Sequence, residues 1–283
     1  ALALVSPLDA DDHDAWHGLL PRCSDGYTPS YRPRSARYRE AMLRTPTGAH
    51  LWAALRLAMA ALLLATILTQ LVTSIDNAVA NDWHLPTVIA NFFSYFTILS
   101  NALSVIVLTW AAVWFWTRGR GLTTAGAPRR EPLPLALALA SVTTYMIVTG
   151  IVYNVLLRGF PLPGAQWTNE ILHVIGPLFL LLDLLVAPHV RSVRWRAIWV
   201  VLAFPIVWVV YTMVRGPFTT SQVTGTTPWY PYPFLDPNSA MTGGIGGVIA
   251  YIVAIAVGIA LVAAGVIWVR RRRGARHAAS LER

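Results

Sequence analysis

Six long apolar runs dominate the sequence and set the strongest limit on what it can fold into. They cover residues 51–75, 87–116, 134–157, 170–187, 196–214 and 243–269. Each is close to the roughly 20 residues that a helix needs to cross about 30 Å of hydrocarbon. Charged residues make up only 12% of the chain, against roughly 25% in soluble domains. The sequence therefore predicts an all-α polytopic membrane protein, a bundle of six transmembrane helices.

The arginines predict how this bundle is oriented. The connections between runs two and three and between runs four and five, and both ends of the chain, are rich in arginine, whereas the other three connections hold only Arg158 and Arg215. Arginine-rich segments remain on the cytoplasmic side of a membrane. We therefore expect a protein of the cell membrane with both termini in the cytoplasm. The net charge of +9 then reflects this orientation, and we expect no nucleic-acid partner.

Composition divides the chain into three segments. Residues 1–48 are rich in Arg, Pro, Asp and Ser and predict a disordered cytoplasmic tail, residues 49–270 form the six-helix domain, and residues 271–283 form a basic cytoplasmic tail. The single Cys23 excludes an internal disulfide and a cysteine zinc site. No His, Asp or Glu pair within the runs has the i, i+4 spacing of metal ligands, so we expect neither metal nor cofactor. The oligomeric state is left open.

The second run contains an unusual number of polar residues. It reads Asn91-Phe-Phe-Ser-Tyr-Phe-Thr-Ile-Leu-Ser-Asn101. Residues three and four apart share one face of a helix, so Ser94, Thr97, Asn101 and Ser104 are predicted to form one polar stripe. This stripe must face protein or water, because polar groups turned toward lipid are costly.

A histidine lies about one turn inside the fourth run. Runs two and four cross in the same direction, and at about 1.5 Å per residue His173 lies roughly 5 Å deep and Thr97 roughly 8–15 Å deep. Asn154 of run three reaches a similar depth, and so do four polar residues of run one, namely Thr69, Gln70, Thr73 and Asp76. We therefore expect a polar site in the outer half of the bundle. A histidine bonded to a neighbouring helix only for packing is the alternative.

These residue types suggest ester hydrolysis. A threonine hydroxyl becomes a useful nucleophile only when a base takes its proton, and His173 is the only histidine within a predicted span. We predict Thr97 as nucleophile and His173 as general base, with Ser94, Asn101 and Asn154 binding the substrate. The two asparagines are the predicted donors to the oxyanion. The expected partners are membrane lipids and a hydrophobic, ester-like small molecule.

Two other features have structural explanations. Arg56 lies near the cytoplasmic end of run one and is expected to reach the headgroups, while Asp183 is expected to pair with Arg191 or Arg194. The loop at 228–237 is dense in aromatic residues and proline, which predicts either an interfacial aromatic belt or a lid over an outward cavity.

The sequence also resembles a known family. The motif around Thr97, the segment Asn169-Glu-Ile-Leu-His173-Val-Ile-Gly-Pro177 and the loop Tyr230-Pro-Tyr-Pro-Phe-Leu-Asp236 resemble the bacterial Pr6Pr family of six-transmembrane proteins, over about residues 50–270. That family looks distantly similar to the eukaryotic androgen-induced and androgen-dependent TFPI-regulating membrane proteins. The resemblance implies a threonine nucleophile at Thr97, a histidine base at His173 and the hydrolysis of fatty acid esters.

Two other functions remain open at this stage. In a small-molecule transporter or channel, the same polar stripe would line a path through the membrane. However, the run becomes apolar after Ser104, with Val105, Ile106 and Val107 next, which favours a cavity closed on the inside. In a non-enzymatic scaffold, Thr97 and His173 would hydrogen-bond only for stability.

Overall fold

The computed structural model describes residues 46–122, 129–159 and 165–279. This described part contains six helices that are long and apolar enough to cross a membrane, as the sequence predicted: Thr47–Ala80, Phe96–Gly119, Leu133–Leu157, Gln166–Val186, Ala197–Phe218 and Ile245–Ala275. Its regular structure is entirely helical. The tail predicted at 1–48 lies outside the described residues, apart from its last three positions.

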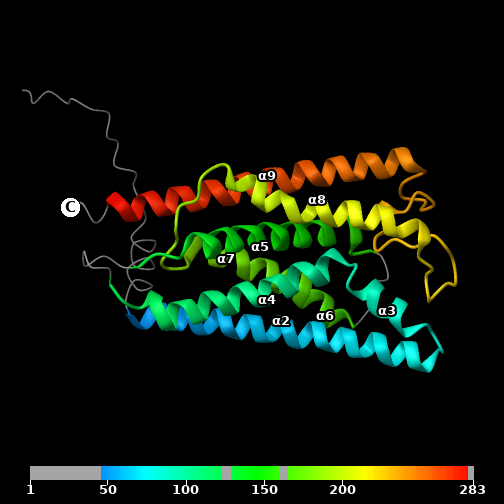
Figure 1. Ribbon diagram of the computed structural model, residues 1–283, viewed down its shortest axis with the longest axis horizontal. Helices are drawn as coiled ribbons and strands as arrows, with labels where there is room; N and C mark the ends of the chain where they lie inside the picture. Colours follow the sequence, from blue (N-terminus) through cyan, green and yellow to red (C-terminus); the bar gives the residue numbers. More distant parts are fainter. Residues whose placement is uncertain (1–45, 123–128, 160–164, 280–283) are drawn as a thin grey trace, which may run out of the picture. The chain divides into compact units, whose positions relative to one another are not determined.

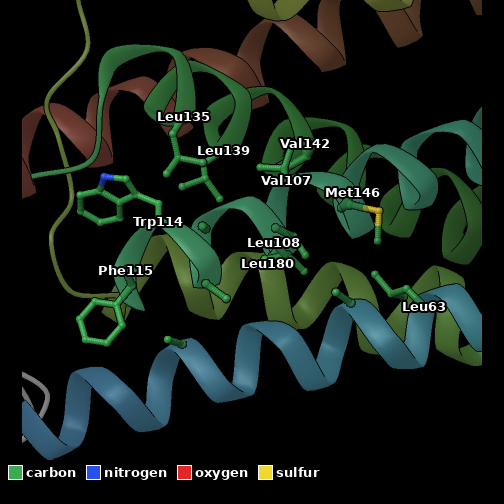
Figure 2. Close-up of a cluster of buried hydrophobic side chains, with 14 of the residues drawn as sticks. Leu63, Val107, Leu108, Trp114, Phe115, Leu135, Leu139, Val142, Met146 and Leu180 are labelled. Atoms are coloured by element: carbon green, nitrogen blue, oxygen red, sulfur yellow. The ribbon is translucent and has the colours of Figure 1, made fainter. Parts of the chain in front are cut away.

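The helices run alongside one another, and α5 (Leu133–Val152) lies in the middle (Figure 1). It contacts α4 (Phe96–Trp114), α7 (Gly176–Val186), α8 (Ala197–Arg215) and α9 (Ile245–Ala279), while α2 (Pro46–Ala80) packs against α4. The contact between α2, α4, α5 and α7 is filled by buried aliphatic side chains such as Leu63, Leu108, Leu139 and Leu180 (Figure 2). Large apolar residues on the outer faces, Val207 and Leu261 among them, remain exposed, as expected of lipid-facing positions.

The second predicted span is interrupted. A short helix, α3 (Leu85–Phe92), ends before Tyr95, which has extended backbone angles (φ −70°, ψ 126°), and α4 begins at Phe96. The backbone carbonyl of Ser94 accepts a hydrogen bond from Trp208 Nε1 (3.0 Å), and the Ser94 hydroxyl contacts Tyr211 (3.0 Å). The predicted stripe is therefore wrong at Ser94, which lies in the break; Thr97 lies at the start of a helix instead of in its middle.

The fourth span combines three segments. These are α6 (Gln166–Glu170), the π-helical turn η3 (Ile171–Ile175) and α7. Further π-helical turns end the second and third spans, at η1 (Phe115–Gly119) and η2 (Tyr153–Leu157). Such wide turns are frequent at functional sites, and η3 contains His173.

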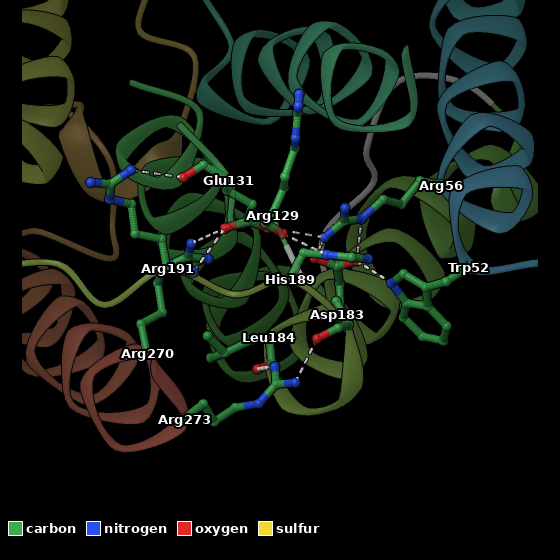
Figure 3. A network of polar contacts seen from close by, with 11 residues as sticks. Trp52, Arg56, Arg129, Glu131, Asp183, Leu184, His189, Arg191, Arg270 and Arg273 are labelled. Carbon is green, nitrogen blue, oxygen red and sulfur yellow. Dashed lines mark hydrogen bonds and ion pairs between the residues drawn. The ribbon is translucent and has the colours of Figure 1, made fainter. Parts of the chain in front are cut away.

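Buried ion pairs join the helices near the arginine-rich end of the bundle (Figure 3). Asp183 accepts hydrogen bonds from Arg56 Nε (2.7 Å), Arg56 Nη2 (2.9 Å) and Trp52 Nε1 (2.7 Å). Glu131, just before α5, pairs with Arg270 and lies 3.6 Å from Arg56 Nη2. Two predictions are thereby wrong. Asp183 pairs with Arg56 and not with Arg191 or Arg194, and Arg56 is only 3% exposed, because α2 and α7 meet at this depth.

The basic stretch predicted as a tail from residue 271 continues α9 as far as Ala279. Arg273 donates to the backbone carbonyls of Leu184 and Ala187, and Arg271 donates to the carbonyl of Val193 (3.3 Å). The first turn of this stretch therefore caps the end of the fourth span and the loop that follows it.

Candidate functional site

The structure brings Thr97 and His173 into hydrogen-bond contact. The Oγ1 of Thr97 lies 3.1 Å from Nε2 of His173. Both residues are buried, at 7% and 6% exposure. Thr97 is the second residue of α4, and His173 is the middle residue of η3. Depth along the helix axes predicted that these two residues meet; their catalytic roles stay a prediction.

The hydrogen bonds of His173 determine which of the two side chains is the donor in the Thr97–His173 hydrogen bond. Its Nδ1 lies 2.9 Å from the backbone carbonyl oxygen of Asn169. A carbonyl only accepts hydrogen bonds, so Nδ1 carries the proton, and in the neutral ring Nε2 is then an acceptor. The Thr97 hydroxyl therefore donates to Nε2, which is the arrangement by which a base activates a hydroxyl nucleophile.

Packing holds the imidazole ring in this orientation. The Tyr153 ring stacks on it, with centroids 4.2 Å apart and an interplanar angle of 22°. The third and fourth spans approach closely at Gly150, where an added Cβ would lie 3.0 Å from Pro177 Cβ and 3.1 Å from the His173 carbonyl oxygen. A larger residue at 150 would therefore displace the turn that contains His173.

Tyr232 is a third member of the site, and it was not singled out from the sequence. Its hydroxyl lies 3.2 Å from both the backbone nitrogen and the Oγ1 of Thr97. The Thr97 amide donates to the phenol oxygen, and the phenol hydrogen is directed to Oγ1. Burial raises the pKa of Tyr232, which keeps the phenol protonated. The only signal in the sequence was the aromatic loop, of which Tyr232, Phe234 and Leu235 are buried.

Two cavities meet at these residues, and Thr97, His173 and Tyr232 line both of them. One, of about 170 Å³, lies among α5, α8 and α9, and aliphatic and aromatic side chains form most of its wall. The other, of about 400 Å³, lies among α2, α3 and the loop after α8, and its wall combines a larger apolar share with several amides and hydroxyls. The hydroxyl of Thr97 thus lies at the boundary between an apolar and a polar chamber.

The three predicted substrate-binding residues are not brought to these cavities. Asn101 Nδ2 donates to the carbonyls of Thr97 (2.8 Å) and Leu172 (3.3 Å), so it ties α4 to the fourth span. Asn154 is exposed, and its Nδ2 donates to the carbonyl of Gly150 (2.8 Å). Ser94 lies in the helix break with its own partners. Asn154 was predicted from its depth, and Ser94 and Asn101 from the spacing of the polar stripe. Rotation about the helix axis turns Asn101 and Asn154 away, and the helix break displaces Ser94.

The polar wall is formed instead by Gln70, Asn77, Asn91, Asn169 and Gln222. Gln70 was noted in the sequence for its depth alone. Within the described ranges, no group of three or more His, Cys, Asp or Glu residues is arranged to hold a metal ion.

Fold and site together define a protein class, namely a six-helix protein of membrane-spanning dimensions with a buried threonine–histidine pair between two cavities. Comparison of the chain with family models, curated proteins and solved structures gave no match. Its function is therefore inferred from its own residues.

Proposed function

We propose that the protein is an intramembrane threonine hydrolase that cleaves a lipid-like fatty acid ester, with Thr97 as nucleophile and His173 as general base. One observation carries the proposal: Thr97 Oγ1 donates to His173 Nε2 over 3.1 Å, while a backbone carbonyl fixes the opposite ring nitrogen. The resemblance to the Pr6Pr family, whose distant eukaryotic relatives are threonine hydrolases, supports the same pair. Membership of that family belongs to the proposal.

The first step is acylation of the threonine. Thr97 Oγ1 attacks the ester carbonyl carbon while its proton moves to His173 Nε2, and the carbonyl oxygen becomes an oxyanion. The amide of Thr97 is one of the first N–H groups of α4, which have no carbonyl partner within their own helix. This amide and the Tyr232 hydroxyl, which it contacts in the resting site, are the proposed donors to the oxyanion. The break before Phe96 makes this amide available.

The remaining steps release first the alcohol and then the acid. The tetrahedral intermediate collapses, the bond to the alcohol oxygen breaks, and His173 returns the proton to the departing alcohol. Water then attacks the acyl-threonine, with His173 again taking and returning the proton, which gives a carboxylic acid and restores Thr97. The acyl chain fits the apolar cavity, and alcohol and water use the polar cavity.

We place the protein in the cell membrane with both termini in the cytoplasm, because the arginines gather at one end of the bundle. The polar cavity is lined by Asn77 near the end of α2, by Trp83 just after it and by the loop after α8. This end of the bundle is opposite to the C-terminal end of α9 (Figure 1). The cavity would then open to the outside, which supplies water for deacylation.

A transporter would need a path from the site to the arginine-rich end. Below Ser104, the α4 side chains Val107 and Leu108 are buried against the neighbouring helices. The buried pair of Arg56, in the first third of α2, and Asp183, in the last turn of α7, lies nearer to that end. This packing favours a closed chamber over a channel.

The proposal is tested by labelling the purified protein with a fluorophosphonate and mapping the adduct by mass spectrometry. We expect the adduct on Thr97, retained in Thr97→Ser and lost in Thr97→Val and His173→Ala. Thr144→Val is the matched control, because Thr144 is buried and, among the residues that the structure describes, its hydroxyl bonds only the carbonyl of Ala140 in its own helix (2.9 Å).

Turnover of a short-chain chromogenic ester should follow the same pattern, with at least a 10³-fold loss in Thr97→Val, as for removal of a nucleophile. Labelling that persists in Thr97→Val would refute the assignment. Absence of labelling in protein whose apolar cavity accepts a photoreactive lipid would favour the scaffold.

A further inference from the structure

The residues that line the polar cavity indicate what kind of alcohol the substrate contains. It has a volume of about 400 Å³, and no Asp, Glu, Arg or Lys of the described chain is among its lining residues. An ionised group bound there would lose water without gaining a direct counter-charge, which is costly. The wall therefore favours a neutral ligand.

The amide groups of this wall suit hydroxyl groups. Amides and hydroxyls each donate and accept hydrogen bonds. The Oδ1 of Asn91 accepts from Arg215 (2.7 Å), and the Oδ1 of Asn169 accepts from Gln70 (3.3 Å). Both asparagines are buried, and their NH₂ groups make no hydrogen bond within the part of the chain that the structure describes. These donors therefore remain available to a ligand.

Aromatic and aliphatic side chains supply the rest of the wall. Trp83, Tyr95 and Trp229 line the cavity together with the amides. Aromatic faces bury apolar area, and a sugar ring presents C–H groups on its faces and hydroxyls at its edge. The volume of this cavity is large enough to admit a sugar ring.

A positive charge, Arg215, lies behind this wall. Arg215 donates to Asn91 Oδ1 and to Ser94 Oγ (3.2 Å), and its guanidinium lies 5.6 Å from the centre of the Trp229 ring. It is not among the lining residues. Its N–H groups donate to Asn91 and Ser94, and its guanidinium packs over the Trp229 ring, so these groups lie between Arg215 and an anionic ligand in the cavity.

We infer that the alcohol half of the substrate is a neutral, hydroxyl-rich polyol such as a sugar. The inference rests on the proposed hydrolase function. Hydrolysis breaks the acyl carbon–oxygen bond, so the polyol leaves with its hydroxyl restored and the acyl chain leaves as a carboxylic acid after water attacks. The acyl chain then lies in the apolar cavity.

The test compares three hexanoyl esters with the full-length protein in nanodiscs. The alcohols are glucose, cyclohexylmethanol as a partner of similar size without further hydroxyls, and a hydroxycarboxylate as an anionic partner. We expect kcat/KM for the glucose ester to exceed that for each of the other two at least tenfold. In Asn77→Leu the ratio of glucose to cyclohexylmethyl ester should fall about threefold to tenfold, the effect of losing one neutral hydrogen bond.

Asn77 suits this test because its exposed side chain makes no hydrogen bond within the described residues, so its replacement leaves the fold intact. Asn81→Leu, one turn further along and outside the cavity lining, should keep the wild-type ratio. Thr97-dependent hydrolysis with equal rates for all three esters, or with a preference for the anion, would overturn the polyol inference and leave the hydrolase standing. Failure of every ester together with absence of Thr97 labelling would reject the proposed function itself.

Discussion

Replacing Asp183 by Asn should destabilise the protein far more than its position near one end of the bundle suggests. The buried cluster contains two arginines and two carboxylates, Arg56, Arg270, Asp183 and Glu131, so its formal charges cancel. Asp183→Asn leaves one positive charge in excess and presents an NH₂ group to donors of Arg56 and Trp52. Arg56 then keeps only Glu131, at 3.6 Å, as a carboxylate neighbour.

The cost follows from the burial of both partners. Removing one partner of a buried, hydrogen-bonded ion pair costs about 3–5 kcal/mol, because the other charge remains without compensation. This corresponds to a loss of about 150-fold to 5,000-fold in the folding equilibrium. Arg158 and Glu170 provide the comparison, since their side chains form an ion pair at 52% and 33% exposure. Glu170→Gln should therefore cost only about 0–1 kcal/mol.

Equilibrium unfolding in mixed micelles of mild detergent and SDS, followed by circular dichroism, measures both costs. The double variant Arg56→Met/Asp183→Leu is the decisive control, because it removes both charges and leaves Glu131 with Arg270. It should be more stable than Asp183→Asn. If Asp183→Asn lowers the free energy of unfolding no more than Glu170→Gln does, the stability of the protein does not depend on the charge balance of this cluster.

Two further predictions concern the loops. Tyr232→Phe keeps the ring but removes the hydroxyl that contacts Thr97. The kcat for ester hydrolysis should therefore fall about 10²-fold, as for loss of one oxyanion donor, while KM changes little. Tyr230→Phe is the control, and an unchanged kcat in Tyr232→Phe would exclude Tyr232 from the mechanism. Burial lowers the pKa of His189, so the unfolded chain binds a proton near pH 6.5 before the folded one does. Stability should therefore decrease as the pH falls below about 6.5, and unfolding titrations of His189→Gln should show a weaker dependence; an equal slope would contradict this origin.

Distances along the membrane normal were predictable from the sequence. Thr97 and His173 were expected to meet because residues in helices that cross in the same direction advance by about 1.5 Å each, and their Oγ1 and Nε2 atoms lie 3.1 Å apart. The six apolar segments were also predictable, because the hydropathy of a segment depends only on its own residues.

Only the tertiary structure decided what these residues contact. Helix rotation turned Asn101 and Asn154 away from the cavities. Packing of α8 against the break before α4 moved Ser94 off its predicted stripe. A loop more than 130 residues away in sequence brought Tyr232 to Thr97.

The buried charges show the same division. The sequence identified Arg56 and Asp183 as charges within spans, but which partner each takes depends on which helices are neighbours. Hydropathy and helical rise are properties of a segment by itself, so the sequence determined the spans and the depth of their polar residues. Partners around each helix and across loops depend on the packing of the whole bundle, and only the tertiary structure decided them.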